Sequence, residues 1–504
     1  MNQSVDWHPA HSKADAAADT TCSLWEQRPD ERAYALLTGG ECKTENRWGH
    51  RINLLELNPD WAVGQSLFIN GNPEVGHYSE RNKQHGFYFT ADNCIGCHAC
   101  EAACSEKNQN PGHIAFRSVG YVEGGSYPDY RRMNISMACN HCDDPVCLKG
   151  CPTKAYTKHT EYGAVLQDPE TCFGCGYCTW VCPYNAPQLD PVMGQVSKCN
   201  MCVDRLEVGL KPACVSACLG NALDFGVVEN IPENRAEARA AIPGFPDPAI
   251  TQPNIRFQQS KRLPEELTRT DSMPLKYHKQ ASGEYRPRVD PKHGMQRQWN
   301  LARLSSRENP LVLFTLLSQG AIGTFMLAFG GSLLGLESMS SLRASVLYAP
   351  LCLAALLMAA GGMFLSTTHL GKPWRFYRGF NNLKFSPVCR EGLGIAVFLS
   401  MLALHVLVSL PHSSLFNRLS DALFGWDTAV LAGPASLLLA NLFGSLALAG
   451  ALGGLYYMYR CYRIQARPFW NHWQVATDFG GQALSLGATL LAVSSLALQP
   501  FTPG

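Results

Sequence analysis

The sequence predicts an α+β protein, in which a cysteine-rich domain of short strands and helices precedes an all-α bundle that crosses a membrane. Two observations lead to this prediction. Sixteen of the 21 cysteines fall between Cys94 and Cys218, and five long apolar segments follow Asn309. The two regions differ so strongly in composition that we expect them to fold as separate parts of the 504-residue chain.

The charge balance does not point to a nucleic-acid partner. The formal net charge is +1 and the pI is about 7.5, so neither nucleic acid nor a strongly acidic partner is expected. The mean hydropathy of -0.10 averages a polar N-terminal part with an apolar C-terminal part. The first residues show neither the apolar core of an export signal nor a twin arginine. If the polar part crosses a membrane, another protein must therefore carry it.

Four regions follow from the composition. Residues 1–85 are polar and irregular and predict an N-terminal extension, whose two isolated cysteines receive no role. Residues 86–226 hold the cysteine motifs between short apolar runs, which predict strands leading into loops. Residues 227–305 are rich in Pro, Arg and Glu, and this composition predicts a linker without a core of its own. Residues 306–504 are the predicted membrane part.

Five apolar segments predict transmembrane helices. They lie near residues 311–334, 346–367, 393–410, 429–458 and 479–498. Each is long enough to cross a hydrocarbon core, which takes about 20 helical residues. So many apolar stretches close together favour a membrane bundle over buried helices of a soluble protein. We expect a multi-pass protein of the cell inner membrane, in contact with the lipid bilayer.

Two of the four cysteine groups have the spacing of bacterial ferredoxins. Group one is CIGCHACEAAC and group three is CFGCGYCTWVCP. In such a run the first three thiolates hold one [4Fe-4S] cluster, and the fourth thiolate ligates a neighbouring cluster. The groups must therefore work in pairs. Their members are Cys94, Cys97, Cys100 and Cys104 in group one, and Cys172, Cys175, Cys178 and Cys182 in group three.

The other two groups have a longer loop before the third cysteine. Group two is CNHCDDPVCLKGCP and group four is CNMCVDRLEVGLKPACVSAC. Both keep the opening C-x-x-C and the closing C-x-x-x-C, so the ligand count is unchanged. Their members are Cys139, Cys142, Cys147 and Cys151 in group two, and Cys199, Cys202, Cys214 and Cys218 in group four. Sixteen thiolates predict four [4Fe-4S] clusters with four ligands each.

Zinc is the alternative metal for such cysteines. Pairs of the C-x-x-C type also build tetrahedral zinc sites. Zinc sites do not explain a further cysteine at the same three-residue offset in every group. A disulfide switch would not need sixteen thiols in metal-binding spacing. Iron-sulfur clusters are therefore the favoured interpretation.

These cysteine motifs and the segments around them resemble those of a known family. The order of the four groups, together with CPYNAPQ and ALDFG, resembles the iron-sulfur subunit of dimethyl sulfoxide reductase and related molybdopterin enzymes over Gly86 to Gly226. The segments ENPLVLFTLLSQGAIGTF and STTHLGKPWRFYRGFNNLKFSPVCREGLG resemble the membrane anchor subunit of the same enzymes. The chain looks like a fusion of two subunits. The family's anchors usually have about eight helices and five are counted here, which leaves open whether further helices lie in sequence outside this chain or in another protein.

The resemblance implies a double ferredoxin-like, four-cluster domain followed by the transmembrane bundle. In the family, groups one and four share one ferredoxin-like fold, and groups two and three share another. This pairing implies four ligand sets: a first set of Cys94, Cys97, Cys100 and Cys218; a second of Cys199, Cys202, Cys214 and Cys104; a third of Cys139, Cys142, Cys147 and Cys182; and a fourth of Cys172, Cys175, Cys178 and Cys151.

The resemblance also implies a function. Menaquinol would be oxidised at the anchor, and a separate molybdopterin catalytic subunit would reduce an oxidised sulfur or nitrogen compound. The chain would then connect that subunit to the quinone pool and carry no catalytic residue itself. His369 and Glu391 are the predicted quinol site, because a quinol needs a proton acceptor as it loses electrons, and ionisable residues at the membrane edge are functional candidates. A helix-capping role is the alternative for His369.

Two other functions remain open at this stage. Electrons would flow the other way if the partner were a formate- or sulfur-oxidising subunit that feeds quinone, because cluster potentials span about -700 to +450 mV. Such anchors often carry b haem, but only His405 lies deep in a predicted helix. The second alternative is an ion-translocating module fed by a polyferredoxin, which would need ionisable residues deep in the helices. The centres of the predicted helices are almost free of carboxylates.

The distribution of basic residues predicts that the cysteine-rich domain faces the cytoplasm. Lys and Arg in short loops favour the cytoplasmic side of a membrane. The two loops on the other side offer only Arg343 and Arg418. The loops on the side of the cysteine-rich domain carry Lys292, Arg297, Arg303 and Arg307 before the first helix, Lys372, Arg375, Arg378, Lys384 and Arg390 after the second, and Arg460, Arg463 and Arg467 after the fourth.

Overall fold

The computed structural model forms two compact units, which are described separately. Unit 1 comprises Met1–Asp144, Lys158–Leu166 and Cys199–Gly294, and unit 2 comprises Pro145–Thr157, Gln167–Lys198 and Met295–Gly504. The second unit thus joins part of the cysteine-rich region to the apolar helices, so the division does not follow the boundary expected near residue 226. The structure describes residues 33–37, 43–55, 80–230, 238–242, 244–259, 264–269, 275–283, 285–289 and 308–498.

A three-stranded sheet lies at the centre of unit 1. Its order is β8 (Leu223–Val227), β1 (His85–Thr90) and β9 (Ile255–Gln258), with β8 antiparallel and β9 parallel to β1. The central strand HGFYFT is buried along nearly its whole length. Strand β9 falls within the expected linker, and its Ile255 and Phe257 are buried. Here the structure differs from a linker without a core, because the short apolar run IRFQ pairs with β1.

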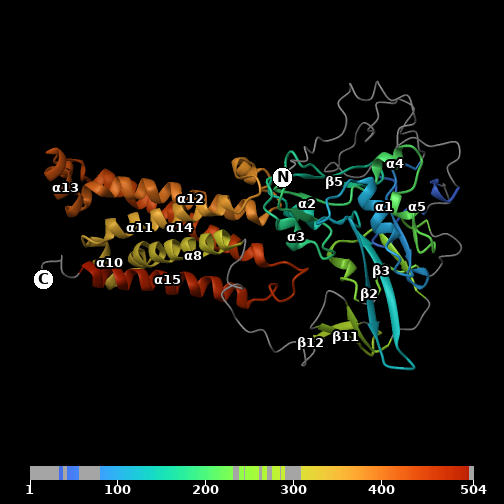
Figure 1. Ribbon diagram of the computed structural model, residues 1–504. Coiled ribbons are helices and arrows are strands. Elements are labelled where there is room, and N and C mark those ends of the chain that lie inside the picture. Colours follow the sequence, from blue (N-terminus) through green and yellow to red (C-terminus); the bar gives the residue numbers. More distant parts are fainter. Residues whose placement is uncertain are drawn as a thin grey trace, which may run out of the picture. The chain divides into compact units, whose positions relative to one another are not determined.

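A second, antiparallel sheet extends from the long hairpin of β2 (Arg117–Gly124) and β3 (Arg131–Ala138), drawn in cyan in Figure 1. The sheet continues through β10 (Glu266–Arg269), β11 (Leu275–Lys279) and β12 (Tyr285–Val289). These last three strands also come from the expected linker. The sequence of that region therefore contributes strands to unit 1 at several places.

Short helices of unit 1 carry Cys100, Cys104 and Cys214. The helices of this unit include α1 (Ala99–Lys107), α4 (Val203–Glu207) and α5 (Ala213–Ser216), with single 3-10 turns at η2 (Ala33–Ala35), η3 (Ala91–Asn93) and η5 (Pro248–Ile250). One apolar core joins the phenylalanines of the central sheet to these helices, and several cysteines belong to it. Its members include Phe87, Phe89, Phe225, Phe257, Leu206, Cys100, Cys104 and Cys214.

The cysteine-rich part of unit 2 is built from small elements. Helices α2 (Val146–Gly150) and α3 (Tyr177–Val181) each form a short turn of helix within a cysteine group, and β6 (Gln188–Asp190) pairs with β7 (Gln195–Ser197). Strands β4 (Tyr156–Lys158) and β5 (Val165–Gln167) form a two-stranded sheet, and their residues are divided between unit 1 and unit 2. The expected strands before the cysteine loops are therefore present.

The rest of unit 2 is a bundle of long helices that lie side by side (Figure 1). Among the described residues, five helices are long and apolar enough to cross a membrane, and they correspond to the five apolar segments of the sequence. They are α8 (Asn309–Phe325), which continues through η6 (Met326–Gly330) and α9 (Gly331–Leu333), α11 (Tyr348–Thr368), α12 (Pro387–Ser409), α14 (Pro434–Tyr462) and α15 (Gln474–Leu498). The connections contain α10 (Glu337–Ala344), η7 (Pro373–Phe380), η8 (Leu410–His412), α13 (Ser414–Phe424) and η9 (Thr428–Leu431).

Two helix boundaries differ from the prediction for a local reason. Helices α12 and α14 each begin with proline at the first helical position, Pro387 and Pro434. Proline suits this position because its missing N–H would have no partner in the first turn anyway. Helix α12 therefore begins six residues before the apolar segment, and its first turns include the charged Arg390 and Glu391.

Small residues bring α12 and α14 together closely. A Cβ atom at Gly394 would lie 2.5 Å from the backbone nitrogen of Gly454, and one at Gly450 would lie 2.6 Å from the nitrogen of Phe398. Small residues at such crossings let helix backbones approach in a membrane, where apolar burial gives little driving force. This close crossing fixes the neighbouring ends of α12 and α14 relative to each other.

Candidate functional site

The first cysteine set surrounds one cavity in unit 1. Cys94, Cys97, Cys100 and Cys218 all line one small cavity. The loop before α1 turns tightly, because Gly96 and His98 adopt left-handed backbone angles, with φ of 70° and 60°. The structure therefore brings three cysteines of group one to the last cysteine of group four.

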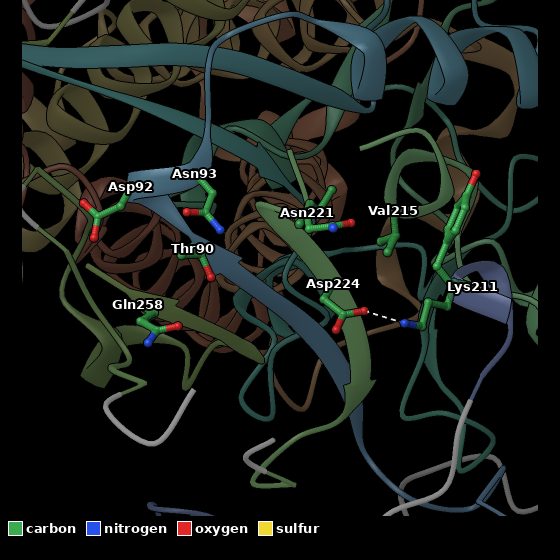
Figure 2. A pocket seen from close by; sticks show the side chains of 10 residues that line it. Thr90, Asp92, Asn93, Lys211, Val215, Asn221, Asp224 and Gln258 are labelled. Atoms are coloured by element: carbon green, nitrogen blue, oxygen red, sulfur yellow. Dashed lines mark hydrogen bonds and ion pairs between the residues drawn. The ribbon is translucent and has the colours of Figure 1, made fainter. Parts of the chain in front are cut away.

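A larger polar pocket of about 570 Å³ lies beside this cavity, and Asn93 and Leu223 line both. Figure 2 shows Asp92, Thr90 and Gln258 toward one side of the pocket and the ion pair of Lys211 and Asp224 toward the other. The Lys211 nitrogen is 2.7 Å from the Asp224 oxygen. Sequence reasoning did not single out this pocket, since its residues come from separate segments without a motif.

The second cysteine set is buried more deeply. Cys104, Cys199, Cys202 and Cys214 are all buried, and they lie on or beside α1, α4 and α5. Burial raises the pKa of the Cys104 thiol to about 12, and the nearby Cys214 and Cys202 contribute to this rise. Metal binding requires deprotonated thiols, so an iron-sulfur cluster at these sulfurs would displace their protons.

The buried guanidinium of Arg117 lies near both sets. Its side chain is 1% exposed, its Nη1 atom donates to Ser136 Oγ at 3.0 Å, and the group stacks over the Phe87 ring. Burial lowers the pKa of Arg117, but the nearby sulfurs of Cys214 and Cys100 raise it, and the net shift is upward. The negative charge near the Arg117 guanidinium is therefore strong only when these cysteines are thiolates.

Backbone donors point at several of the sulfurs. The Leu223 nitrogen donates to Cys218 Sγ, the Met201 nitrogen to Cys199 Sγ and the Ala155 nitrogen to Cys151 Sγ, each at 3.4 Å. Hydrogen bonds to sulfur stabilise the thiolate form and influence cluster potentials. Together with the cavity and the unpaired arginine, these contacts fit an anionic iron-sulfur cluster. In the described part of the chain no three His, Cys, Asp or Glu side chains converge on a point that suits a single metal ion.

In unit 2, the structure brings Cys151 to the three cysteines of the fourth set. Cys172 and Cys175 are near neighbours of Cys151, and Cys178 lies close to both Cys175 and Cys151. The buried Tyr156 lies against this set. Burial, followed by the nearby Cys178 and Cys147, raises the pKa of its phenol.

The third set is described in two halves. Cys139 and Cys142 follow β3 in unit 1, and both are buried. Cys147 lies in α2, and Cys182 ends α3 in unit 2. Their joint role as ligands stays a prediction of the sequence.

The loops of the fourth set are held by residues from the membrane part of unit 2. Asn382 Nδ2 donates to the Cys151 carbonyl at 2.8 Å, and Ser386 Oγ donates to the Gly150 carbonyl at 2.8 Å. These carbonyls end α2 and would otherwise lack a helical partner. Arg375 Nη1 donates to the carbonyl of Cys172 at 3.1 Å. Asn382 and Ser386, which lie just before α12, thus cap the C-terminal end of α2.

Glu391 is linked to the fourth set through two contacts. The Cys461 thiol donates to Glu391 Oε2 at 3.1 Å, and the Cys461 carbonyl accepts a hydrogen bond from the Tyr177 hydroxyl at 3.0 Å. Tyr177 stands in α3 between Cys175 and Cys178. The half-buried His369 ends α11 as its C-cap residue. A single residue, Cys461, therefore connects Glu391 to helix α3. His369 lies at the end of a different helix, α11.

Aromatic side chains cover the same junction. Trp180 of α3 packs against Trp470 and Tyr462, with ring centroids 5.8 and 6.4 Å apart. Tyr462 also packs against Phe479 of α15. Helix α3 therefore packs against an apolar surface made by the end of α14 and the connection that follows it.

Sequence reasoning missed four residues of these sites: Arg117, Tyr156, Tyr177 and Cys461. None of them was part of a recognised ligand pattern. The tyrosine within CGYC was the only available signal, because a residue between two ligands must lie near a cluster. Arg117 gave no signal, since a strand's register decides which side chains are buried.

Comparisons with known proteins match the cysteine-rich region and the apolar C-terminal region to two different families. A family described as a 4Fe-4S dicluster domain matches residues 131–228, and the DMSO reductase anchor subunit (DmsC) family matches residues 304–499. One chain of the anaerobic dimethyl sulfoxide reductase of Haemophilus influenzae is 38% identical over 188 residues, which cover 36% of this protein and 91% of the relative. Its Escherichia coli counterpart is 37% identical over 180 residues, or 34% and 87%.

A further relative has a name that indicates a different activity. One subunit of a sulfite dehydrogenase from Allochromatium vinosum is 35% identical over 208 residues, which cover 36% of this protein and 86% of the relative. The cysteine-rich region therefore serves as an iron-sulfur electron-transfer module, and the apolar helices anchor it in a membrane as a multi-pass protein. The protein belongs to the family of dimethyl sulfoxide reductase iron-sulfur subunits and carries the family's anchor subunit in the same polypeptide.

Proposed function

We propose that this chain transfers electrons between menaquinol and a separate molybdopterin catalytic subunit through four [4Fe-4S] clusters, held by the first, second, third and fourth cysteine sets. Each cluster, when bound, accepts and passes on single electrons. The chain's own residues supply the thiolates, the donors to sulfur and the attachment to the membrane. No residue of the chain acts on the terminal substrate in this proposal.

The observation that carries the proposal is the attachment of the fourth set to the helix ends beside Glu391. Tyr177, between two ligands of that set, donates to the carbonyl of Cys461, whose thiol donates to Glu391. A quinol bound beside Glu391 would be close to the fourth set. Electron transfer needs such proximity between donor and acceptor, and the proposed quinol site meets this need.

Glu391 is the proposed proton acceptor in quinol oxidation. Menaquinol loses two electrons and two protons, so a nearby base must take a proton as the electrons leave. Glu391 Oε2 accepts a hydrogen bond from the Cys461 thiol, which is a weak donor, so the carboxylate keeps acceptor capacity. His369 is the proposed second polar group for the quinol, at the end of α11.

The test uses the full chain in membranes and menadiol as electron donor. His369→Ala and Glu391→Gln are each expected to slow cluster reduction by menadiol by about 100-fold, the scale of a lost general base. Reduction by dithionite should stay normal, because it bypasses the quinol site. His412→Ala serves as the matched control, since His412 contacts Ser436 at the opposite ends of α12 and α14. Full menadiol rates in both site variants would contradict the assignment.

Metal content tests the cluster number separately. Four sets of four thiolates predict about sixteen irons and about sixteen acid-labile sulfides per chain. Iron and sulfide are measured on anaerobically purified protein. A content near eight irons would overturn the assignment of four clusters.

A relative with sulfite dehydrogenase activity in its name supports a second candidate, in which electrons run from a sulfur-oxidising subunit into quinone. The relay and its ligand sets would be the same, but the direction would be reversed. Purification with the native catalytic subunit separates the candidates. Reduction of the clusters by sulfite would favour the second candidate, and their oxidation by dimethyl sulfoxide would favour the first.

We propose that the cysteine-rich domain faces the cytoplasm across the cell inner membrane. Arg375 donates to the Cys172 carbonyl and Lys372 Nζ donates to Gln195 of β7, so part of the basic charge has a docking role. The remaining asymmetry still follows the positive-inside rule. Protease added to intact spheroplasts is expected to leave this domain uncut, and cleavage would place it outside. Lys292, Arg297, Arg303 and Arg307, which contribute to the charge count, lie outside the described residues.

A further inference from the structure

Among the described residues of unit 1, three cationic side chains are fully buried, and two of them have a carboxylate partner. Lys158 Nζ lies 3.0 Å from Asp143 Oδ1, and Arg256 Nη2 lies 2.5 Å from Glu229 Oε1. Arg117 is equally buried but forms no ion pair with a carboxylate in the described residues. A buried charge without a counter-charge is strongly unfavourable, so the folded protein must supply an anion near Arg117.

Two nitrogens of Arg117 are left without a hydrogen-bond partner. Its Nε and Nη2 atoms are buried and have no acceptor among the described protein atoms. The third nitrogen, Nη1, donates to Ser136 Oγ at 3.0 Å, and the same oxygen lies 3.3 Å from Cys100 Sγ. The guanidinium is therefore one hydroxyl away from a sulfur of the first set, with further donors unused.

Cysteines of both sets of unit 1 lie near the Arg117 guanidinium. Cys100 belongs to the first set, whereas Cys104, Cys199 and Cys214 belong to the second. A cluster with four thiolates carries net negative charge, which gains one unit on reduction. The missing anion is thus available from two directions once clusters occupy both sets.

We propose that Arg117 is the shared counter-ion of the first and second clusters and raises the reduction potentials of both. A fixed positive charge stabilises the reduced, more negative form of each cluster over the oxidised form. The effect is large because Arg117, Cys100 and the cysteines of the second set are buried, where charges are screened less than in water. This inference rests on the proposed clusters at the first and second sets, and it assigns Arg117 a role that the cysteine pattern does not imply.

The test measures cluster potentials directly in the full purified chain. Arg117→Met removes the charge and keeps an unbranched apolar side chain, and Arg117→Lys keeps the charge. Potentials come from electron paramagnetic resonance spectra recorded during redox titration. Arg117→Met should lower the equilibrium constant for reduction of the first and second clusters by about tenfold or more. This corresponds to a fall in reduction potential of about 59 mV for a one-electron couple. The other two clusters should keep their potentials.

Two variants control for charge and for folding. Arg132→Gln removes a charge from an exposed arginine on the neighbouring strand β3 and should shift no potential. Arg117→Lys should bring both potentials most of the way back toward those of the unmodified protein. If Arg117→Met loses both clusters while Arg117→Lys keeps them, the counter-ion role is supported, because charge then decides whether the clusters are held.

Three results would overturn the proposal. These are unchanged potentials in Arg117→Met, a shift in only one of the two clusters, and loss of clusters in both Arg117→Met and Arg117→Lys, which would assign the side chain to packing. Failure of the underlying cluster assignment is distinguishable. In that case the unmodified protein would itself lack two of the expected signals or hold about half of the predicted iron.

Discussion

The two units differ in the buried polar side chain that lies beside their cysteine sets. In unit 1 a buried guanidinium, Arg117, lies near sulfurs of the first and second sets. In unit 2 a buried phenol, Tyr156, lies near Cys147, Cys151 and Cys178. One group is a permanent cation and the other is neutral. Nearly identical ligand spacing therefore does not imply similar electrostatics, and the potentials of the proposed clusters in the two units should differ for that reason.

The units also differ in how their cysteines meet the surroundings. In unit 1, Cys97 is exposed, and its neighbour Ile95 is 72% exposed. In unit 2, Cys178 is buried, and the aromatic side chains Trp180 and Trp470 pack together beside α3. The first set is open to a partner or to solvent, while the fourth is closed by residues of its own chain. This contrast predicts that ligand loss in the two sets has different consequences.

The largest expected effect comes from removing a ligand of the fourth set. Cys178→Ala should lose one cluster, lower the iron content from about sixteen to about twelve and abolish reduction of the remaining clusters by menadiol. Cys97→Ala should lose the same amount of iron but leave menadiol reduction of the others intact, because none of the hydrogen bonds from the membrane helices described above reaches the first set. Equal menadiol rates in the two variants would remove the functional contrast between the sets.

A smaller effect is expected where the anchor holds the fourth set. Arg375→Ala removes hydrogen bonds from a charged donor to the carbonyls of Pro169 and Cys172, a loss of about 2 kcal/mol. The urea concentration that bleaches the iron-sulfur absorbance should fall. Arg463→Ala is the matched control, since its hydrogen bonds to Tyr459 and Asn471 stay within the membrane part. A similar fall in both variants would show a general loss of bundle stability instead.

Cys461→Ala tests the link between Glu391 and the fourth set. The thiol donates to Glu391 Oε2, and its loss should slow menadiol-dependent reduction about tenfold, near the lower end for hydrogen bonds to charged groups. Cys461→Ser retains a donor and should restore most of the rate. Cys352→Ala, which deletes a buried thiol beside Tyr348 in α11, should leave the rate unchanged. If serine fails to restore the rate, the thiol acts through packing.

The smallest expected effect tests the neutral group of unit 2. Tyr156→Phe removes only the hydroxyl near Cys178. The reduction potential of the fourth cluster should fall, and its equilibrium constant for reduction should change by less than about tenfold. The change is small because a neutral hydrogen bond is worth about 0.5–1.5 kcal/mol. Redox titration measures this shift beside that of Arg117→Met. A larger shift in the tyrosine variant would reverse the comparison between the two units.

Local patterns in the sequence predicted much of the architecture. Cysteine spacing indicated the iron-sulfur region, and the length of the apolar runs indicated five membrane helices, because both signals depend on neighbouring residues. Composition failed for residues 227–305, where β9 enters the central sheet of unit 1. A strand of four residues with two buried apolar side chains, Ile255 and Phe257, is too short to outweigh its polar surroundings in an average.

By itself, the sequence determined the ligand residues that were proposed, the iron-sulfur chemistry and the membrane anchor, since repeated spacing and continuous apolar length need no knowledge of distant contacts. Only the tertiary structure decided that Arg117 lies buried beside two cysteine sets without a carboxylate partner among the described residues. It also decided that Tyr177 and Glu391, more than two hundred positions apart in the sequence, meet through Cys461. Such contacts depend on strand register and helix crossing, which place side chains together without leaving a local pattern.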